Sequence, residues 1–236
     1  MVQTLNIGAP YEKPATLRVF FRKVGALQYI SHLDLMRTMT RVVIRARIPV
    51  AYSEGFNPIP RLSFAAPLSV GVESEYEILD LKITNEVEPD EVMAALNRNL
   101  SDALSVFSVA FAEHKVKDAA YAAYTVTLHL GEKSEALCEK VASILSEQPL
   151  TVLKKTKSGE REVDLSPLVK SVSAICEAGD IKVELALLCD NASFLNPDYL
   201  VGVLKQRLGI LSPDDLSESY RIVRTGIFLP DGAYFR

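Results

Sequence analysis

The chain has 236 residues, of which 48% are hydrophobic and 24% are charged, and its formal net charge is -4. This composition excludes a mainly disordered protein and a polycation, so any binding of nucleic acid must come from a local surface. No apolar run approaches the roughly 18 residues that cross a bilayer, and residues 1–17 lack a basic start followed by an apolar block. We therefore expect a cytoplasmic protein without membrane contact.

Sequence motifs of several enzyme classes are missing. The chain has no GxxxxGK[ST] phosphate loop, no GxGxxG dinucleotide loop and no GxSxG nucleophile elbow. None of its three histidines has a neighbour at metal-ligand spacing, and its three cysteines are too far apart for a CxxC site. We therefore expect neither a metal nor a cofactor. The cysteines are interpreted as reduced core residues: Cys138, Cys176 and Cys189.

The sequence of the first half of the chain predicts one complete folding unit of strands and helices. Residues 1–15 have little periodicity and are interpreted as an N-terminal tail, and the unit follows over residues 16–114. Its expected elements alternate between strands and helices in the order β-α-β-β-α-β, which is that of a ferredoxin-like unit. They are Leu17–Arg22, Ser31–Ala46 (helix), Arg61–Ala66, Tyr76–Thr84, Pro89–Leu100 (helix) and Val106–Ala112.

The second half repeats this pattern over residues 120–230, before a C-terminal tail at residues 231–236. The helices expected near Pro89 and Pro197 both start with Pro-Asp and then share the same apolar spacing. We therefore predict an α+β fold of two tandem ferredoxin-like units with antiparallel sheets. The expected elements are Tyr121–Leu130, Ser134–Gln148 (helix), a strand from Thr151 that continues into a polar hairpin to Glu162, Ile181–Cys189, Pro197–Leu208 (helix) and Tyr220–Leu229.

Basic residues are concentrated in one segment. Between Lys13 and Arg61 the chain has nine basic and two acidic residues, a local charge of +7, so the remainder carries -11. This asymmetry indicates an anionic partner for the first unit. Within the first expected helix, four charged residues fall on one stripe at about 100° per residue. They are Asp34, Arg37, Arg41 and Arg45.

Two interpretations of this stripe remain open. Three guanidinium groups in line suit the oxygens of successive phosphates, because each group offers a planar fork of donors. The alternative is a solvated helix face on which Asp34 pairs with Arg37. At the start of the same helix, Ser31 and Asp34 have the spacing of a capping box.

The segment from Tyr52 to Arg61 is the second candidate. Gly55 can adopt a positive φ, and the ring of Phe56 can stack on an unpaired base, whereas Asn57 can hydrogen bond to a base edge. We expect Ser53 and Gly55 to support the shape of this loop. The alternative is a purely structural connection in which Phe56 is buried.

His32 is the only histidine that we consider as a catalyst. It stands at the start of the first helix and could act as a general base if a hydroxyl were within reach. The alternative is a histidine that packs at the edge of the core.

Three short strings of the sequence resemble those of a known family. The strings ISHLDLMR at residues 30–37, YSEGFNP at residues 52–58 and RTG at residues 224–226 resemble the radical-SAM-linked family, known as domain of unknown function 2344. Members of that family occur alone, or fused to or encoded beside a radical-SAM protein. This chain has no CxxxCxxC motif for the usual cluster, so it resembles a stand-alone partner. It has Ile59 where the family more often has histidine.

The resemblance and the basic segment together favour a non-catalytic, RNA-binding or substrate-presenting accessory module for a radical-SAM enzyme in RNA modification. Phosphates would be held by arginines, and bases would contact Phe56 and Asn57. The arginines are Arg37, Arg41, Arg45 and Arg61. Two alternatives stay open: a metal-independent ribonuclease that uses His32, and a protein–protein adaptor whose basic face binds an acidic partner without RNA.

Overall fold

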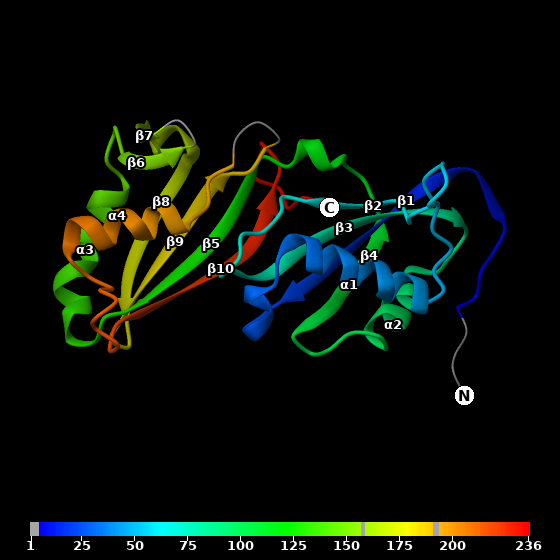
Figure 1. The fold of residues 1–236 in the computed structure, drawn as a ribbon, viewed down its shortest axis with the longest axis horizontal. Coiled ribbons are helices and arrows are strands. Elements are labelled where there is room, and N and C mark those ends of the chain that lie inside the picture. Colours follow the sequence, from blue (N-terminus) through cyan, green and yellow to red (C-terminus); the bar gives the residue numbers. More distant parts are fainter. Residues whose placement is uncertain (1–4, 157–158, 191–193) are drawn as a thin grey trace. The chain divides into compact units, whose positions relative to one another are not determined.

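The computed structural model describes residues 5–156, 159–190 and 194–236. The chain divides into two compact units, which are unit 1 (Met1–Asp118 with Phe235–Arg236) and unit 2 (Ala119–Tyr234). Each unit combines antiparallel strands with helices, so the fold is mixed α/β (Figure 1). In the part of the chain that is described, no helix is both long and apolar enough to cross a membrane.

Unit 1 contains all six of its expected elements. Strands β4, β1 and β3 are neighbours in that order, β2 pairs with β3, and every pairing is antiparallel. The elements are β1 (Pro10–Lys23), α1 (His32–Arg45), β2 (Leu62–Ala65), β3 (Glu73–Asn85), α2 (Pro89–Asn97) and β4 (Leu104–Phe111), with short 3-10 helices at η1 (Gly25–Tyr29) and η2 (Val116–Asp118).

The two faces of the unit 1 sheet have different surroundings. On one face, alternate side chains of β1 such as Leu17 and Val19 are fully buried and form one core with residues of α1 and α2. Because successive side chains of a strand point to opposite faces, Arg18 of β1 lies on the other face. Asp80 of β3, which stands between two buried leucines, lies there too. Lys82 lies on this second face as well.

Helix α1 has the amphipathic pattern that the sequence predicts. Four apolar side chains along one stripe are buried in the unit 1 core, and the charged stripe is exposed. Ser31 is the N-cap and Ala46 the C-cap, so the predicted helix is confirmed to within one residue at each end. The buried residues are Leu35, Met39, Val42 and Val43.

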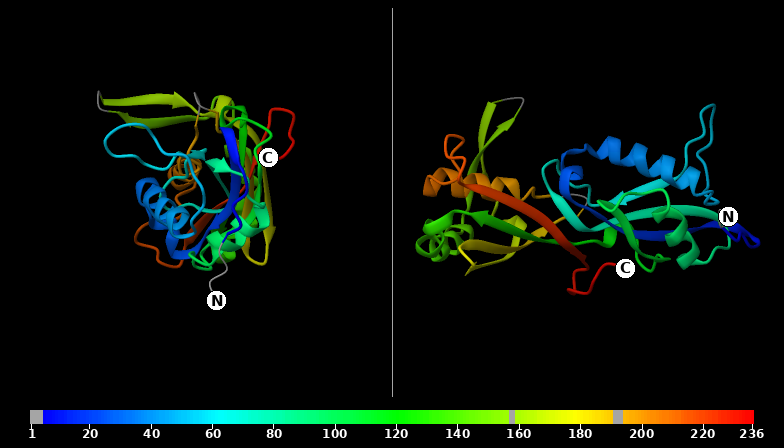
Figure 2. Two further views of the ribbon diagram at one scale, coloured as in Figure 1. Left: turned by 90° about the vertical axis from the view of Figure 1, so that its right-hand side faces the viewer. Right: turned by 90° about the horizontal axis from the view of Figure 1, so that it is seen from below.

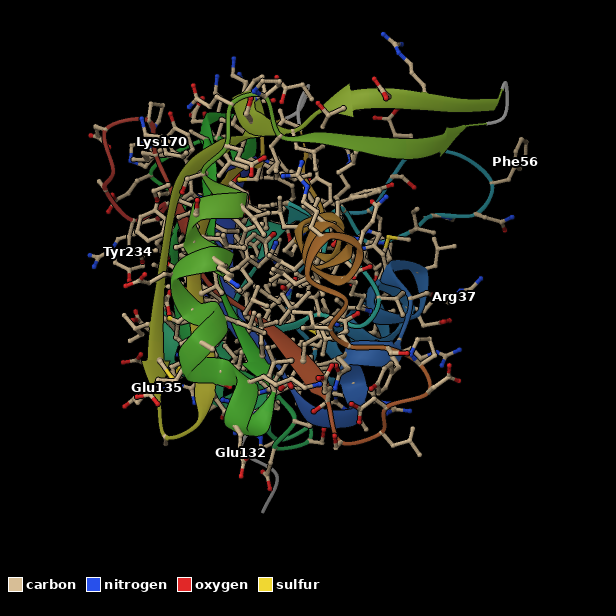
Figure 3. All side chains as sticks on the ribbon, turned by 90° about the vertical axis from the view of Figure 1, so that its left-hand side faces the viewer. Arg37, Phe56, Glu132, Glu135, Lys170 and Tyr234 are labelled. Atoms are coloured by element: carbon tan, nitrogen blue, oxygen red, sulfur yellow. The ribbon has the colours of Figure 1, made fainter. Side chains whose placement is uncertain are left out.

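Unit 2 has the antiparallel strand order β10-β5-β9-β8, together with a separate hairpin of β6 and β7 that projects from the rest of the unit (Figure 3). Strands β5 and β9 alternate between buried and half-exposed residues. The elements are β5 (Tyr121–His129), η3 (Gly131–Lys133), α3 (Ser134–Leu145), β6 (Thr151–Thr156), β7 (Gly159–Asp164), η4 (Ser166–Leu168), β8 (Val169–Glu177), β9 (Asp180–Leu188), α4 (Asp198–Leu208) and β10 (Ser219–Phe228).

The structure departs from the sequence expectations at several places, including the fully buried Phe235 in the expected C-terminal tail and the half-buried Cys138. Strand β1 begins at Pro10, inside the segment expected to be a tail. Strand β8 is absent from the elements expected from the sequence, and it pairs with β9, whereas the strand that starts at Thr151 pairs with β7. Cys176 lies on β8 and is exposed, so its expected place in the core is wrong, because β8 is an edge strand with few buried residues.

Candidate nucleic-acid interface

A compact set of polar contacts fixes the start of α1. The Ser31 hydroxyl accepts a hydrogen bond from the Asp34 backbone N–H (3.1 Å) and donates one to Asp34 Oδ2 (2.7 Å). Arg37 Nη1 lies 3.2 Å from Asp34 Oδ1. The Ser31 hydroxyl, followed by the Arg37 guanidinium, lowers the pKa of Asp34 below its ordinary value. The carboxylate therefore remains charged at the N-terminus of α1, where the helix dipole favours an anion.

The three arginines of α1 form an exposed row, which we call the α1 arginine surface (Arg37, Arg41 and Arg45). Their spacing of four residues places them on one side of the helix. Arg37 pairs with Asp34, but both side chains are more than half exposed, so this ion pair holds Arg37 weakly. Arg41 and Arg45 form no ion pair or hydrogen bond through their side chains with the residues that the structure describes.

Burial reduces the charge that the basic segment presents to solvent. Arg18 and Lys23 are buried inside unit 1 and add nothing to its exposed surface. The other seven basic residues between Lys13 and Arg61 are exposed, as are the two acidic ones. A net positive surface therefore remains, although it is smaller than the sequence count of +7 indicates.

The loop that follows α1 is called the Phe56 loop (Tyr52–Pro60). Hydrogen bonds join its two ends, and the residues at its tip are exposed to solvent. At its base, the Ser53 N–H donates to the Ile59 carbonyl (2.8 Å) and the Ile59 N–H donates to the Ser53 hydroxyl (3.1 Å). Gly55 has a φ of +121°, a conformation that other residues rarely adopt. Ser53 thus bonds across the base of the loop, and Gly55 stands at its position of positive φ.

The tip of the Phe56 loop presents its side chains to solvent. Phe56 has a relative exposure of 107%, so the alternative in which this ring is buried does not apply. Asn57 is also exposed. The loop extends beyond one end of α1 (Figure 2), and Arg37 and Phe56 both point outward from unit 1 (Figure 3). An exposed ring thus accompanies the α1 arginine surface on the same unit.

His32 occupies a packing position. Its ring meets the ring of Phe64 nearly edge-on, with 5.2 Å between the centroids, and Phe64 in turn packs edge-on against Phe21. His32 is half-buried at the edge of the unit 1 core. This is the arrangement that the packing alternative describes.

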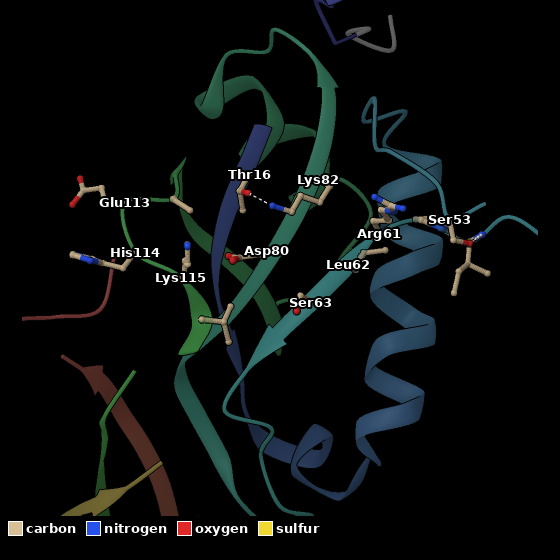
Figure 4. A pocket seen from close by; sticks show the side chains of 14 residues that line it. Thr16, Ser53, Arg61, Leu62, Ser63, Asp80, Lys82, Glu113, His114 and Lys115 are labelled. Carbon is tan, nitrogen blue, oxygen red and sulfur yellow. Dashed lines mark hydrogen bonds between the residues drawn. The ribbon is translucent and has the colours of Figure 1, made fainter. Parts of the chain in front are cut away.

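Arg61 belongs to a different place from the arginines of α1. It lines a cavity of about 830 Å³ in unit 1, together with residues of β1, β2 and β3 and of the segment that follows β4 (Figure 4). None of the α1 arginines lines this cavity. The structure therefore separates the predicted phosphate-binding arginines into a helical surface and a cavity.

The floor of the cavity is a buried ion pair that sequence reasoning missed. Asp80 lines the cavity, and its carboxylate receives hydrogen bonds from Arg18 Nε (2.7 Å) and Nη2 (2.8 Å). Arg18 also donates to the backbone carbonyls of His114 (2.9 Å) and Arg236 (2.7 Å), and it lies over the Phe235 ring at 4.4 Å. Charged residues of opposite sign between apolar neighbours in two predicted strands were the available signal for this pair.

A comparison with protein families identifies the chain. Residues 16–197 match the family described as "Uncharacterized protein conserved in bacteria (DUF2344)". The chain belongs to this family. The matched range includes α1, the Phe56 loop and the residues that line the cavity.

Other comparisons add little. The search of curated proteins finds no match. Among solved structures, an unknown protein from Galdieria sulphuraria is 12% identical with a TM-score of 0.26, covering 90% of this chain and 99% of its own. A putative glycine cleavage system transcriptional repressor is 10% identical (TM-score 0.23; 89% and 98% covered), and DyPB from Rhodococcus jostii RHA1 is 11% identical (TM-score 0.21; 92% and 94% covered). These low TM-scores support no argument about fold or function.

Proposed function

We propose that unit 1 binds RNA through the α1 arginine surface and the Phe56 loop. The observation that carries this proposal is the row of exposed arginines in which Arg41 and Arg45 have no partner among the described residues. Guanidinium groups at successive helical turns suit the phosphates of a nucleic-acid backbone, which attract cations irrespective of sequence.

The Phe56 loop would supply contacts that the arginines cannot. A fully exposed aromatic ring offers a flat surface on which an unpaired base can stack, and this mode of contact is typical of single-stranded RNA recognition. The Asn57 amide next to it has both donors and an acceptor for a base edge. Because hydrogen bonds between Ser53 and Ile59 close the base of the loop, binding would order few additional residues.

The proposed setting is that of an accessory module for a radical-SAM enzyme in RNA modification. Its support is the resemblance of the ISHLDLMR and YSEGFNP strings to radical-SAM-linked proteins. In this role the chain would hold the RNA, and the partner enzyme would perform the chemistry. The strand orders β4-β1-β3-β2 and β10-β5-β9-β8 support the further proposal that both units are ferredoxin-like.

The test compares RNA affinity over a series of salt concentrations for the native protein and a variant in which the three α1 arginines are replaced by alanine. For single strands, each lost phosphate contact reduces the slope of log K against log salt by about 0.7. We expect the triple variant to bind more weakly and its slope to fall by about two.

The matched control removes the same number of charges from other exposed positions. Lys13, Lys117 and Lys140 are exposed and form no side-chain ion pair with the described residues, and their triple alanine variant should largely retain the native slope. An unchanged affinity and slope in the α1 variant would contradict the proposal. Copurification of a radical-SAM partner after ribonuclease treatment tests the accessory role separately.

A further inference from the structure

The floor of the unit 1 cavity carries no uncompensated negative charge. Asp80 presents its carboxylate to the cavity, but the fully buried Arg18 forms two hydrogen bonds with that carboxylate from beneath. Pairing of this kind neutralises the acid in place. An anionic ligand that entered the cavity would therefore meet a neutral floor.

Three further cations line the cavity around this floor. The Lys82 ammonium donates a hydrogen bond to the Thr16 hydroxyl, and no hydrogen bond or ion pair links the side chains of Arg61 and Lys115 to the described residues. Figure 4 shows Lys82 and Lys115 on either side of Asp80, whereas Glu113, the other lining acid, points away from the strands. The cavity thus has a surplus of positive charge.

The remainder of the wall suits a ring. Five apolar residues line the cavity beside the hydroxyl groups of Thr16 and Ser63. Its volume of about 830 Å³ lies within the range of small-molecule sites. A ligand that fits this combination has an anionic group, hydroxyl groups and an apolar ring. The five apolar residues are Ile59, Pro60, Leu62, Ala112 and Val116, of which Leu62 also packs against the unit 1 core.

We propose that this cavity binds a nucleoside 5′-monophosphate. The phosphate would lie between Lys82 and Lys115 within reach of Arg61, the ribose hydroxyls would face Ser63, and the base would lie against the apolar wall. The nucleotide can be free or can be the 5′-terminal nucleotide of an RNA, and this second source rests on the proposed function.

The experiment measures binding of the four nucleoside 5′-monophosphates and the four nucleosides to the full chain by calorimetry, at ligand concentrations up to about 5 mM. We expect at least one monophosphate to bind about tenfold more tightly than its nucleoside, because the phosphate adds charge-assisted hydrogen bonds. Lys82→Ala and Lys115→Ala should each weaken that binding about tenfold. Both positions are exposed, so the thermal unfolding curves should match the native one.

Two additional arms separate the sources and the sites. A 5′-phosphorylated oligoribonucleotide is compared with its 5′-hydroxyl form, and a gain that Lys82→Ala abolishes identifies the RNA end as the ligand. Monophosphate binding without such a gain identifies a free nucleotide. The control that removes Lys13, Lys117 and Lys140 should bind monophosphates as the native protein does.

Failure of this inference differs from failure of the proposed function. If no monophosphate binds, or if Lys82→Ala and Lys115→Ala leave binding unchanged, the cavity site is wrong even where RNA still binds the α1 arginine surface. If monophosphates bind but the α1 triple variant retains full RNA affinity, the cavity site stands and the proposed function fails.

Discussion

The guanidinium of Arg18 and the carboxylate of Asp80 form two parallel hydrogen bonds across β1 and β3, at 2.7 and 2.8 Å. Both residues are buried. Removal of one partner from a buried pair leaves an uncompensated charge, which typically costs about 3–5 kcal/mol. We expect Asp80→Ala to lower the free energy of unfolding by this amount in urea denaturation.

A double variant tests whether the lost charge pairing is the cause. In Arg18→Met/Asp80→Leu, both charges are replaced by apolar side chains of similar size, and the free energy of unfolding should recover most of the loss. If the double variant is less stable than Asp80→Ala, the bonds from Arg18 to the His114 and Arg236 carbonyls contribute more than the ion pair does.

The capping box of α1 predicts a change in the pKa of Asp34. The Ser31 hydroxyl is the main cause of its lowered pKa, and Arg37 adds to the effect. A lowered pKa means that the charged form stabilises the fold above the ordinary pKa, and that this contribution is lost as the pH falls through the lowered value. In Ser31→Ala, carboxyl NMR should show the pKa of Asp34 rising towards its ordinary value, whereas Arg37→Ala should raise it less.

The same substitution removes the N-cap of α1. Loss of a serine cap typically costs about 1 kcal/mol, because the backbone N–H of Asp34 loses its acceptor. Chemical denaturation of Ser31→Ala measures this cost. Ser31→Thr keeps a hydroxyl that can both accept from the Asp34 N–H and donate to its carboxylate, so it should lose little stability. An equal loss in both variants would contradict a capping role.

Phe56 should affect RNA binding and leave stability unchanged. Stacking on an aromatic ring contributes about 1–3 kcal/mol per base, so Phe56→Ala should weaken binding of single-stranded RNA about tenfold or more. Phe56→Tyr keeps the ring and should bind nearly as the native protein does. Because the ring is fully exposed, neither variant should change the melting temperature. A lower melting temperature in Phe56→Ala would show that the ring packs against the protein.

The cysteines of unit 2 should differ strongly in reactivity. Burial raises the pKa of the Cys189 thiol to about 11, whereas Cys176 is exposed on β8. At pH 8 an alkylating reagent should therefore modify Cys176 first and leave Cys189 largely unmodified, because the thiolate is the reactive form. Mass spectrometry of the alkylated peptides over a pH series measures both rates. Comparable rates at the two positions would contradict the burial of Cys189.

Prediction from the sequence succeeds where periodicity is strong. Helix α1 follows from its apolar spacing and from the Ser31–Asp34 capping box, and both are present in the structure. The helices near Pro89 and Pro197 also agree with the structure, and Val92 and Leu200 are buried at equivalent positions. These elements were predictable because the core-facing side chains repeat every three to four residues.

Strand β8 shows where periodicity fails. It forms an edge of the unit 2 sheet, so few of its residues are buried, and its sequence alternates too weakly to predict a strand.

The cavity was not predicted from the sequence for a different reason. Thr16, Asp80 and Lys82 come together only through the pairing of β1 with β3, and the register of two strands is a tertiary property. Sequence separation concealed their proximity.

Ser53 and Ile59 close the base of the Phe56 loop and also line the cavity. A molecule in the cavity therefore contacts the residues that close the loop, whereas a base would stack at the tip of the same loop. Any effect of one ligand on the affinity for the other must be reciprocal, because both free energies belong to one thermodynamic cycle. The hydrogen bonds between Ser53 and Ile59 are thus the place where occupancy of the cavity could set how strongly the loop holds RNA.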